Sequence, residues 1–361
     1  MPDTAASETR ASICLLVNPS AGGGRAARLA PQAERLLRDR GLSVRRVDTR
    51  DLEHARELAV QAARAGETVV VLSGDGAVGA VAESIRSIPG AVLGVLPGGR
   101  GNDLARALGI SQEIEQACAT IAEGEARAMD VGEVCETAQA PDDPAAHVPA
   151  QRQQAPRTFV GIASAGFDSD ANRIANEAPS WLGNLVYAYG ALRALLSWRP
   201  ARFEIELDPP GERHSFLAYT VGACNSRSYG GGMRAAPDAL LDDGLLEVVV
   251  LANVGKLAFL TKILPRVFSG THVNEPHVHV FRAREVSIEA DRPFTMYADG
   301  DPIGELPLRV RAVPGAVNVL VPRGANVDFA FSDASGLVGL GASTASAAGN
   351  APLTGEAPDA G

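Results

Sequence analysis

Apolar runs alternate with segments of helical periodicity over the first 128 residues. The apolar runs that predict strands are residues 12–19, 42–49, 67–74 and 91–97. The segments that predict helices are residues 25–41, 51–66, 77–85 and 102–110. Continuous apolar strands that alternate with helices are typical of a parallel sheet covered on both faces. Ligands of such sheets bind beyond the carboxyl ends of the strands.

The rest of the chain is richer in strands and poorer in long helices. The segments that predict strands are 158–167, 202–208, 215–224, 245–251, 277–281, 285–290 and 294–300, with a last apolar strand at 316–322. Two helices are expected between them, around 181–198 and 255–268. This pattern predicts a mostly β second domain.

Two segments have a composition that does not suit a packed core, and the first of them, 136–157, has almost no large apolar residues. Residues 136–157 are rich in alanine, proline and glutamine, and the residues after about 334 are small and of low complexity. We interpret 136–157 as a disordered insert and 334–361 as a disordered tail.

Composition narrows the class of protein. The chain has 361 residues, a hydrophobic content of 46% and a net charge of −10, which suit two globular domains and disfavour nucleic acid as a partner. Its four cysteines lie far apart in the sequence, which favours reduced thiols in the cytosol over a disulfide framework or a zinc site. No signal-type segment and no run of about 18 apolar residues is present. We therefore expect a cytoplasmic, soluble protein that contacts membranes only at their surface.

Three glycine-rich turns follow three of the predicted strands: "NPSAGGG" (18–24), "SGDGAVG" (73–79) and "PGGRGND" (97–103). A single turn of this kind is often an ordinary tight turn. Three turns at equivalent strand ends favour an anion site, because glycines let backbone N–H groups approach a phosphate and a following helix adds positive potential.

Two common phosphate-binding motifs are absent. A P-loop needs a lysine after its glycines, and neither Lys256 nor Lys262, the only lysines of the chain, has that context. The first turn does not have the GxGxxG pattern of dinucleotide enzymes, which disfavours hydride transfer.

The motifs resemble the diacylglycerol kinase catalytic domain family, which includes bacterial lipid kinases and sphingosine kinases and is related to NAD kinases. The resemblance rests on Asn18 to Gly22, on Gly74-Asp75-Gly76 and on "PGGRGNDLAR" (97–106). It continues in order through "GFDSDAN" (166–172), "NSRSYGGGMRAAPDALLDDGLLEVVV" (225–250) and "YADGDP" (297–302). It covers roughly residues 12–322, without the 136–157 insert.

The resemblance implies an α/β ATP-binding domain over 11–128, to which a final strand at about 316–331 returns. A β-sandwich-like lipid domain over 129–315 follows. It implies an ATP- and Mg²⁺-dependent phosphotransferase that acts on a lipid hydroxyl at the inner membrane face, foremost on diacylglycerol to give phosphatidic acid. A sphingoid base, phosphatidylglycerol, a polyprenol or a soluble alcohol remains an alternative acceptor, and a weakly catalytic nucleotide- or lipid-binding protein is another. Relatives also form homodimers.

The family's nucleotide contacts map onto residues of all three turns and of the second strand end. They are Asn18, Pro19, Ser20, Ala21, Gly22, Thr49, Gly74, Asp75, Gly76, Ala77, Asn102 and Asp103, and Arg100 is a further candidate contact that the family pattern does not contain. Asp75 is expected near the metal and the phosphates as a catalytic residue, and it also suits a cap of the helix that follows it.

The motif "ADGDP" carries the candidate base. The family has Asp-Gly-Glu here, and its acid after glycine takes the proton of the lipid hydroxyl. The matching residue is Asp301, one methylene shorter, and Asp299 is a second candidate. Asp-Gly also favours a β-hairpin turn.

A second metal site is implied in "PDALLDDGLLEV". Related enzymes hold a structural magnesium there, and the matching ligands are the Asp243 carboxylate and the carbonyls of Leu240 and Leu245. Oxygen ligands suit such a hard cation.

The chain departs from the family pattern at the phosphate turns. Ser73 and Ala77 replace a glycine and a threonine, and Arg100 replaces another threonine. We expect the Arg100 guanidinium to contact phosphates and to offset the missing hydroxyls. The alternative is a surface arginine paired with Asp103 or Glu83.

Overall fold

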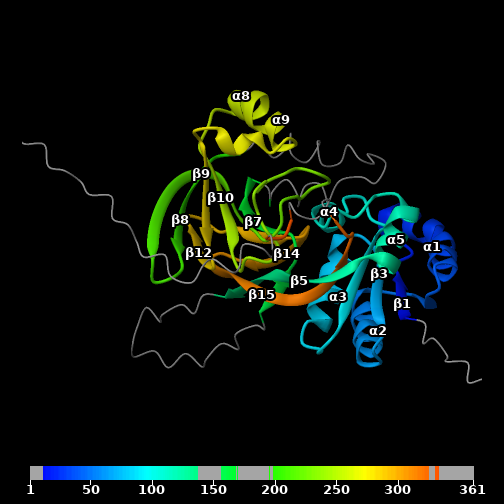
Figure 1. Cartoon of the computed structure of the whole chain (residues 1–361). Helices are drawn as coiled ribbons and strands as arrows, with labels where there is room; N and C mark the ends of the chain where they lie inside the picture. Colours follow the sequence, from blue (N-terminus) through cyan, green and yellow to red (C-terminus); the bar gives the residue numbers. More distant parts are fainter. Residues whose placement is uncertain are drawn as a thin grey trace, which may run out of the picture.

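The computed structural model describes residues 11–136, 156–167, 169, 195, 198–324 and 330–332. Within these ranges one continuous mixed sheet contains fifteen strands, and its main path runs in the order β14-β13-β7-β9-β8-β12-β15-β4-β3-β1-β2. Figure 1 shows the helical domain at one end of this sheet and the strand-rich domain at the other.

The first domain alternates strands and helices as the sequence predicts. Its elements are β1 (Ser12–Val17), α1 (Ala21–Asp39), β2 (Ser43–Asp48), α2 (Leu52–Arg64), β3 (Thr68–Ser73), α3 (Asp75–Ile85), β4 (Val92–Pro97), α4 (Asp103–Ala107) and α5 (Ile114–Glu123). The helix expected over 102–110 is only five residues long, because Asn102 adopts a left-handed conformation before it and Gly109 another after it. Helix α5 is absent from the sequence prediction.

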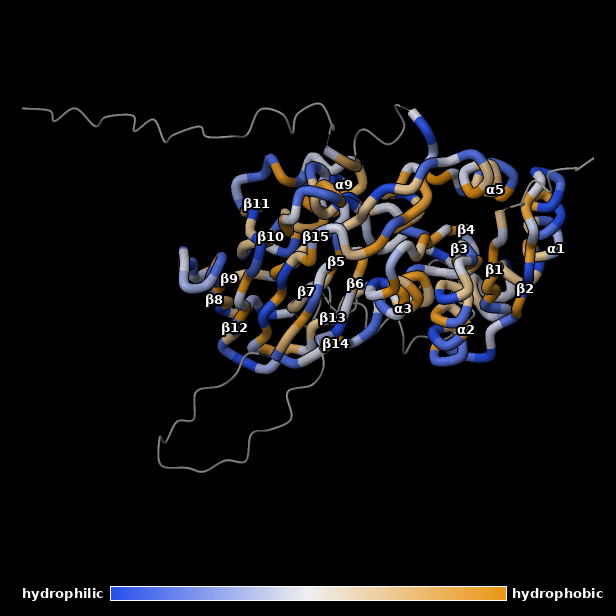
Figure 2. Tube along the Cα trace, turned by 60° about the horizontal axis from the view of Figure 1, so that its bottom comes forward, coloured by the Kyte–Doolittle hydropathy of each residue, from blue (hydrophilic) through white to orange (hydrophobic). Residues whose placement is uncertain are grey.

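Helices cover both faces of the parallel strands. Strands β1 to β4 pair in parallel, in the order β4-β3-β1-β2. Helices α1 and α5 pack together on one face, and α2 and α3 on the other (Figure 2). Helix α2 buries Ala55, Ala59 and Ala62, which recur at helical spacing and let the helix lie close to its neighbours.

The second domain is mostly antiparallel. Its strands are β5 (Glu125–Glu136), β6 (Arg157–Phe159), β7 (Ile162–Gly166), β8 (Ala201–Leu207), β9 (Glu212–Cys224), β10 (Leu246–Ala252), β11 (Val278–Ala283), β12 (Glu285–Ala290), β13 (Thr295–Ala298), β14 (Asp301–Glu305) and β15 (Leu308–Val321). Its helical segments are α8 (Lys256–Ala258), the π-helical turn η2 (Phe259–Ile263), α9 (Leu264–Val267) and the 3-10 turn η3 (Thr271–Asn274).

Several elements differ from their predicted bounds. The strand expected over 158–167 is divided into β6 and β7, and β14 is an additional strand in the segment expected as a turn. The insert expected at 136–157 is narrower than predicted, because Glu136 belongs to β5 and Arg157 to β6. Residues 137–155, the tail 334–361 and most of the helix expected at 181–198 lie outside the described residues.

Strands β5 and β15 belong to both domains. They pair antiparallel from Leu308 with Glu136 to Val321 with Glu125, while β15 also pairs with β12 near one end and with β4 near the other. The two hydrophobic cores meet along them, since Val131 lies in the first core and Val134 in the second. The expected boundary at residues 128 and 129 therefore falls inside a strand.

No helix in the part of the chain that the structure describes has both the length and the hydropathy needed to span a bilayer.

A buried ion pair holds α3 against this strand pair. Glu133 on β5 is 3% exposed and accepts hydrogen bonds from Arg86 Nη2 at 2.7 Å and from Arg311 Nε at 2.8 Å. Burial opposes the ionisation of Glu133, but the two guanidinium groups outweigh it and hold its pKa below the ordinary value. Arg86 ends α3, so this carboxylate links the helix to both shared strands.

We predict that Glu133→Gln lowers the free energy of unfolding by about 3 kcal/mol, because it leaves two guanidinium groups without their buried counter-charge. Because the pKa of Glu133 is depressed in the folded state, its contribution is present above the unfolded pKa of about 4.3 and is lost as the pH falls through the folded value. Urea unfolding at pH 7 and pH 4 measures both effects.

The matched control is Glu125→Gln, since Glu125 lies on the same strand with a side chain 47% exposed. It should change the unfolding free energy by less than about 0.5 kcal/mol. Equal stability of Glu133→Gln and the wild type at pH 7 would contradict the interpretation.

Candidate active site

The three glycine-rich turns touch one another at the carboxyl ends of β1, β3 and β4. A Cβ atom at Gly99 would lie 2.5 Å from the Cα of Gly74, and one at Gly22 would lie 2.5 Å from the carbonyl oxygen of Gly98. Both distances are shorter than van der Waals contact allows. Glycine is therefore required here for close packing of three backbones, and the packed turns form one surface.

The first turn is shaped by Asn18. Its Oδ1 accepts hydrogen bonds from the N–H and the hydroxyl of Ser20, at 3.2 and 2.8 Å. Gly22, Gly23 and Gly24 follow with φ of +59°, +66° and +84°, which only glycine adopts readily in succession. Thr49 lies nearby at the end of β2, where its hydroxyl donates to the carbonyl of Val17 at 3.1 Å.

The third turn is held by Asn102, which is buried with φ of +53°. Its Oδ1 accepts from the N–H of Gly99 at 2.7 Å, and its Nδ2 donates to the Gly99 carbonyl at 3.2 Å and to Gln112 at 3.0 Å. Its side chain thus fixes the loop that carries Arg100.

Asp75 is the first residue of α3, but it caps a different helix. Its Oδ1 accepts from the N–H of Leu104 in α4 at 2.9 Å, and no side chain caps α3. The expected cap of the following helix is therefore wrong, because the Asp75 carboxylate accepts its hydrogen bond from α4 of the neighbouring third turn instead. Asp75 joins the second turn to the third.

Asp103 connects the two domains. Its Oδ2 accepts from the N–H of Gly231 at 2.8 Å, whereas its buried Oδ1 has no hydrogen-bond partner among the described residues. Burial raises the pKa of Asp103, and the charge of Asp75 adds to the increase. A buried acceptor without a partner suits a site that a ligand completes.

The hairpin between β13 and β14 carries the other two carboxylates. Ala298 pairs with Asp301, so Asp299 and Gly300 form a two-residue turn, and their φ of +51° and +95° are typical of a type I′ turn. The expected hairpin and the expected acidic site therefore coincide in one segment.

Asp299 binds backbone on the far side of the site. Its Oδ2 accepts from Val160 N–H at 2.8 Å, and its Oδ1 accepts from Gly161 and Ile162 at 2.9 and 3.2 Å. These bonds explain why the chain divides into β6 and β7 at this point. Burial and the charge of Asp75 raise the pKa of Asp299 to about 7, against the lowering effect of the three N–H groups.

Asp301 is exposed and faces the start of α3. Its Oδ2 lies 3.3 Å from the position of a Cβ at Gly76, and Asp299 Oδ2 lies 3.5 Å from that of a Cβ at Gly79. These glycines, one helical turn apart, let the hairpin approach α3. Asp75, Asp299 and Asp301 therefore gather at one helix N-terminus.

Arg100 is exposed at the edge of this cluster. Among the residues that the structure describes, Arg100 forms no ion pair, since Glu83 pairs with Arg56 and the Asp103 carboxylate receives Gly231 N–H. Neither of the acids named as alternative partners, Asp103 and Glu83, therefore pairs with Arg100, and its guanidinium borders a cavity.

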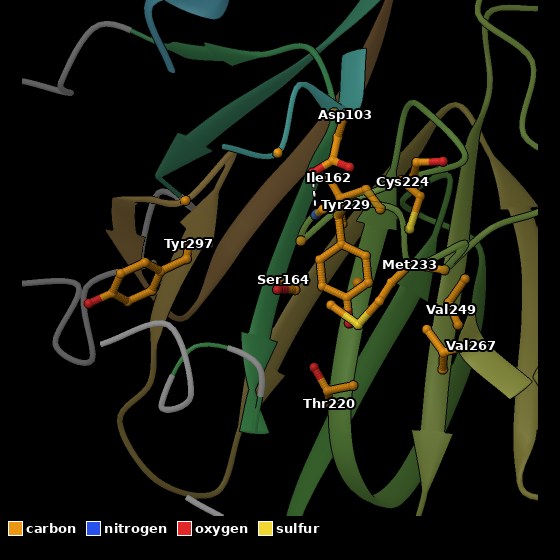
Figure 3. Close-up of a pocket in the computed structure, with 18 of the residues that line it drawn as sticks. Asp103, Ile162, Ser164, Thr220, Cys224, Tyr229, Met233, Val249, Val267 and Tyr297 are labelled. Carbon is orange, nitrogen blue, oxygen red and sulfur yellow. Dashed lines mark hydrogen bonds between the residues drawn. The ribbon is translucent and has the colours of Figure 1, made fainter. Parts of the chain in front are cut away.

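A cavity of about 540 Å³ runs from the carboxylates into the second domain. Asp75, Arg100, Asp103 and Asp299 border its polar end. The apolar part is lined by Phe167, Val249, Leu251, Phe259, Ile263, Leu264, Val267 and Val278. In Figure 3, Asp103 lies at the top of the cavity, with Tyr229, Met233 and Val249 below it and Thr220 at the bottom.

Sequence reasoning missed the walls of this cavity, although a signal exists. Alternate residues of three strands line it, namely Ile162 and Ser164 of β7, Thr220, Gly222 and Cys224 of β9, and Val249 and Leu251 of β10. This spacing of two follows from the pleat of a strand. His272, a buried residue whose Nδ1 has no partner within the described ranges, also lines the cavity.

The second predicted metal site lies apart from the cavity. Asp243 Oδ1 accepts from the N–H of Leu245 at 3.0 Å, and its Oδ2 pairs with Arg282. The part of the chain described here contains no group of three or more His, Cys, Asp or Glu side chains arranged to hold a metal ion. The ligand set of Asp243, Leu240 and Leu245 stays a prediction.

Comparison with known families gives the class of the protein. Residues 12–134 match the family described as the diacylglycerol kinase catalytic domain, and residues 161–321 match the YegS C-terminal NAD kinase beta sandwich-like domain. A diacylglycerol kinase of Mycobacterium tuberculosis is 33% identical over 315 residues, which cover 86% of this chain and 95% of that protein. The chain therefore belongs to the diacylglycerol kinase catalytic domain family, and it is a lipid kinase.

Other relatives agree with this assignment. A diacylglycerol kinase of Bacillus subtilis is 27% identical over 276 residues, covering 76% of this chain and 83% of its own. The crystal structure of a diacylglycerol kinase from Bacillus anthracis matches with a TM-score of 0.64 at 20% identity, covering 88% of this chain and 98% of that one. That likeness confirms the expected fold, an α/β domain followed by a β-sandwich-like domain.

We predict that Asp299→Asn lowers the free energy of unfolding by about 1–3 kcal/mol at pH 8.5, above the raised pKa of Asp299. An amide has one acceptor oxygen, so one of the N–H groups of Val160, Gly161 and Ile162 loses its partner. Urea unfolding measures the loss.

The control is Asp208→Asn, because Asp208 also has a positive φ but accepts both its N–H bonds, from Arg284 and Glu285, on Oδ1 alone. An asparagine oxygen keeps both bonds, so a change below about 0.5 kcal/mol is expected. Identical urea midpoints for Asp299→Asn and the wild type would show that the three bonds are not what holds the turn.

Proposed function

We propose that this lipid kinase transfers the γ-phosphoryl group of ATP to the hydroxyl of diacylglycerol, giving phosphatidic acid. One observation carries the proposal: a single cavity joins a polar end with carboxylates and an arginine to a long apolar interior. A nucleotide phosphate suits the first part and acyl chains suit the second. Its volume of about 540 Å³ lies within the range of ligand sites.

The residues at the polar end fit a nucleotide phosphate with its cation. The packed turns of Gly22, Gly74 and Gly99 leave backbone uncovered by side chains, and the N-terminus of α3 adds positive potential. Arg100 supplies a fixed cation without a competing ion pair in the described chain. Asp75 and the buried Oδ1 of Asp103, unpartnered among the described residues, would supply the oxygen ligands that Mg²⁺ prefers. When bound, Mg²⁺ would neutralise phosphate charge.

The acceptor hydroxyl belongs between the apolar cavity and α3. Acyl chains that occupy the slot between β7, β9, β10 and the segment 256–267 leave the glycerol headgroup at the polar end. Asp301 follows Gly300, which borders the cavity, and no described residue donates a hydrogen bond to its carboxylate. We therefore assign Asp301 as general base and Asp299 as the residue that holds the turn.

The reaction then requires one proton transfer and one displacement. The Asp301 carboxylate accepts the hydroxyl proton while the hydroxyl oxygen forms a bond to the γ-phosphorus. The bond between the γ-phosphorus and the bridging oxygen breaks, and ADP leaves with that oxygen. Arg100 and the α3 N-terminus stabilise the charge on the transferred group.

Diacylglycerol is favoured over a sphingoid base, phosphatidylglycerol or a polyprenol by the names of the relatives. The Mycobacterium tuberculosis and Bacillus subtilis proteins are both named diacylglycerol kinase. Transfer of ³²P from labelled ATP to each lipid in mixed micelles, resolved by thin-layer chromatography, tests the acceptor. Greater labelling of another lipid than of dioleoylglycerol would contradict the choice.

We predict that Asp301→Asn lowers kcat for dioleoylglycerol by at least about 100-fold and changes the KM for ATP little, because general base catalysis contributes about 10²–10⁴-fold. Asp301→Glu, which restores the acid usual in the family, should keep most of the activity. Steady-state kinetics in micelles measure both variants.

The control for Asp301 is Glu305→Gln at the other end of β14, which should leave kcat within about twofold. Full activity of Asp301→Asn would remove this residue from the mechanism. Absence of transfer to any lipid by the wild type would contradict the proposed function itself.

We predict that Arg100→Ala raises the KM for ATP about tenfold, because charge-assisted hydrogen bonds to phosphate are lost. Arg100→Lys should recover only part of this, since an ammonium lacks the planar fork. Arg213→Ala, a highly exposed arginine on the hairpin of β8 and β9, is the control and should not change the KM. An unchanged KM for Arg100→Ala would exclude the phosphate contact.

A further inference from the structure

We propose that the outward face of residues 256–268 docks on an anionic lipid bilayer and places the opening of the apolar cavity against that bilayer. The proposal deepens the proposed function, on which it rests for the identity of the cavity's ligand. It concerns a surface formed by α8, η2 and α9 with Phe268, which we call the docking segment. Figure 1 shows α8 and α9 standing at the edge of the β-domain, outside its strands.

The docking segment has two apolar faces, and only one of them is explained by packing. Phe259, Ile263, Leu264 and Val267 face inward and line the cavity. Leu257, Leu260 and Phe268 face outward, with 76%, 37% and 57% of their surfaces exposed. A helix at the surface of a water-soluble protein normally has one apolar face, which packs on the core, and one polar face. The second apolar face of this segment therefore indicates a contact surface.

Exposed apolar residues of this size are concentrated here. Among the described residues, the exposed large hydrophobic side chains are Leu52, Leu217, Leu257, Leu260, Phe268 and Val280. Three of them lie inside the docking segment, between residues 257 and 268, and the other three lie on α2, β9 and β11. The concentration marks this segment as a contact surface, while single exposed residues elsewhere are ordinary.

The positive charge of the docking segment favours an anionic partner. Residues 248–274 contain no aspartate or glutamate, although the chain carries 43 acidic residues and a net charge of −10. Both lysines of the chain, Lys256 and Lys262, lie in this stretch. Arg266 lies there as well, and its guanidinium pairs with Glu275 at 3.1 Å, just beyond the stretch. Apolar side chains interspersed with cations suit the headgroup region of an anionic membrane, where each cation near the surface contributes about 1 kcal/mol.

A second copy of this chain fits the surface less well. Two copies joined through this face would bring Lys256 and Lys262 of one protomer toward the same cations of its partner. A bilayer also explains why the cavity lies directly behind the segment, because a lipid can then pass between its inner side chains without crossing water.

The experiment is sedimentation of the full-length protein with vesicles of phosphatidylcholine and phosphatidylglycerol at a ratio of 7:3. We expect the wild type to bind these vesicles, and to bind pure phosphatidylcholine vesicles at least tenfold more weakly. The double variant Leu257→Ser/Phe268→Ser should lose at least tenfold in apparent affinity. Lys262→Gln should lose about fivefold, as expected for one cation at an anionic surface.

The control is Leu52→Ser/Leu217→Ser, which removes two exposed leucines from other faces, where 45% and 47% of their surfaces are exposed. Control binding should equal that of the wild type. Equal binding by Leu257→Ser/Phe268→Ser and the wild type would overturn the proposal. So would a wild-type dimer in light scattering that becomes a monomer in this variant, because the face would then join two copies.

Kinase activity toward dioctanoylglycerol in detergent micelles separates this proposal from the proposed function. Leu257→Ser/Phe268→Ser should retain wild-type activity there, because neither side chain lines the cavity, and should lose activity on vesicles in proportion to binding. Absence of micelle activity in the wild type would contradict the proposed function. The docking surface would then be tested by vesicle binding alone.

Discussion

The antiparallel pairing of β5 with β15 is the constraint on which the site depends. These strands run through both domains, so the β-domain sheet extends directly from the parallel sheet of the nucleotide turns. A hinge between the domains would have to break this ladder. Glu133 adds a buried link from the same strands to the end of α3. The carboxylates of the hairpin and the N-terminus of α3 are therefore held in place before any ligand binds, as efficient phosphoryl transfer requires.

The hairpin at Asp299 shows how one short segment serves folding and chemistry together. Asp299 and Gly300 adopt the conformation that a tight two-residue turn requires. The Asp299 carboxylate accepts hydrogen bonds from three backbone N–H groups. This leaves Asp301 at the start of β14 with its carboxylate directed toward α3. One glycine therefore separates the acid that holds the turn from the acid that we propose as general base. Glycines at 76 and 79 let the hairpin approach α3 closely, which suits an aspartate at 301 in place of the longer glutamate of the family.

The sequence pattern predicted those features that depend on interactions between residues close together in the chain. The strands and helices of the first domain and the glycine turns followed from apolar runs and turn chemistry, and the motif order indicated the family. Contacts between distant residues were out of reach: the bond from Asp75 to Leu104, the division of 158–167 by Asp299, and the strand pairing that makes two domains share one sheet. The cavity belongs to this second group, since its walls come from three strands and a helix that are separate in sequence.

The mechanism that we propose requires one cleft that holds a nucleotide at the glycine turns and a lipid alcohol in the apolar cavity, with Asp301 between them. A crystal structure with a non-hydrolysable ATP analogue and a diacylglycerol tests it most directly. We expect the γ-phosphate beside Arg100 and the α3 N-terminus, acyl chains along Val249 and Phe259, and the lipid hydroxyl about 3 Å from the Asp301 carboxylate. A lipid bound outside this cavity, or a nucleotide bound away from the three turns, would contradict it.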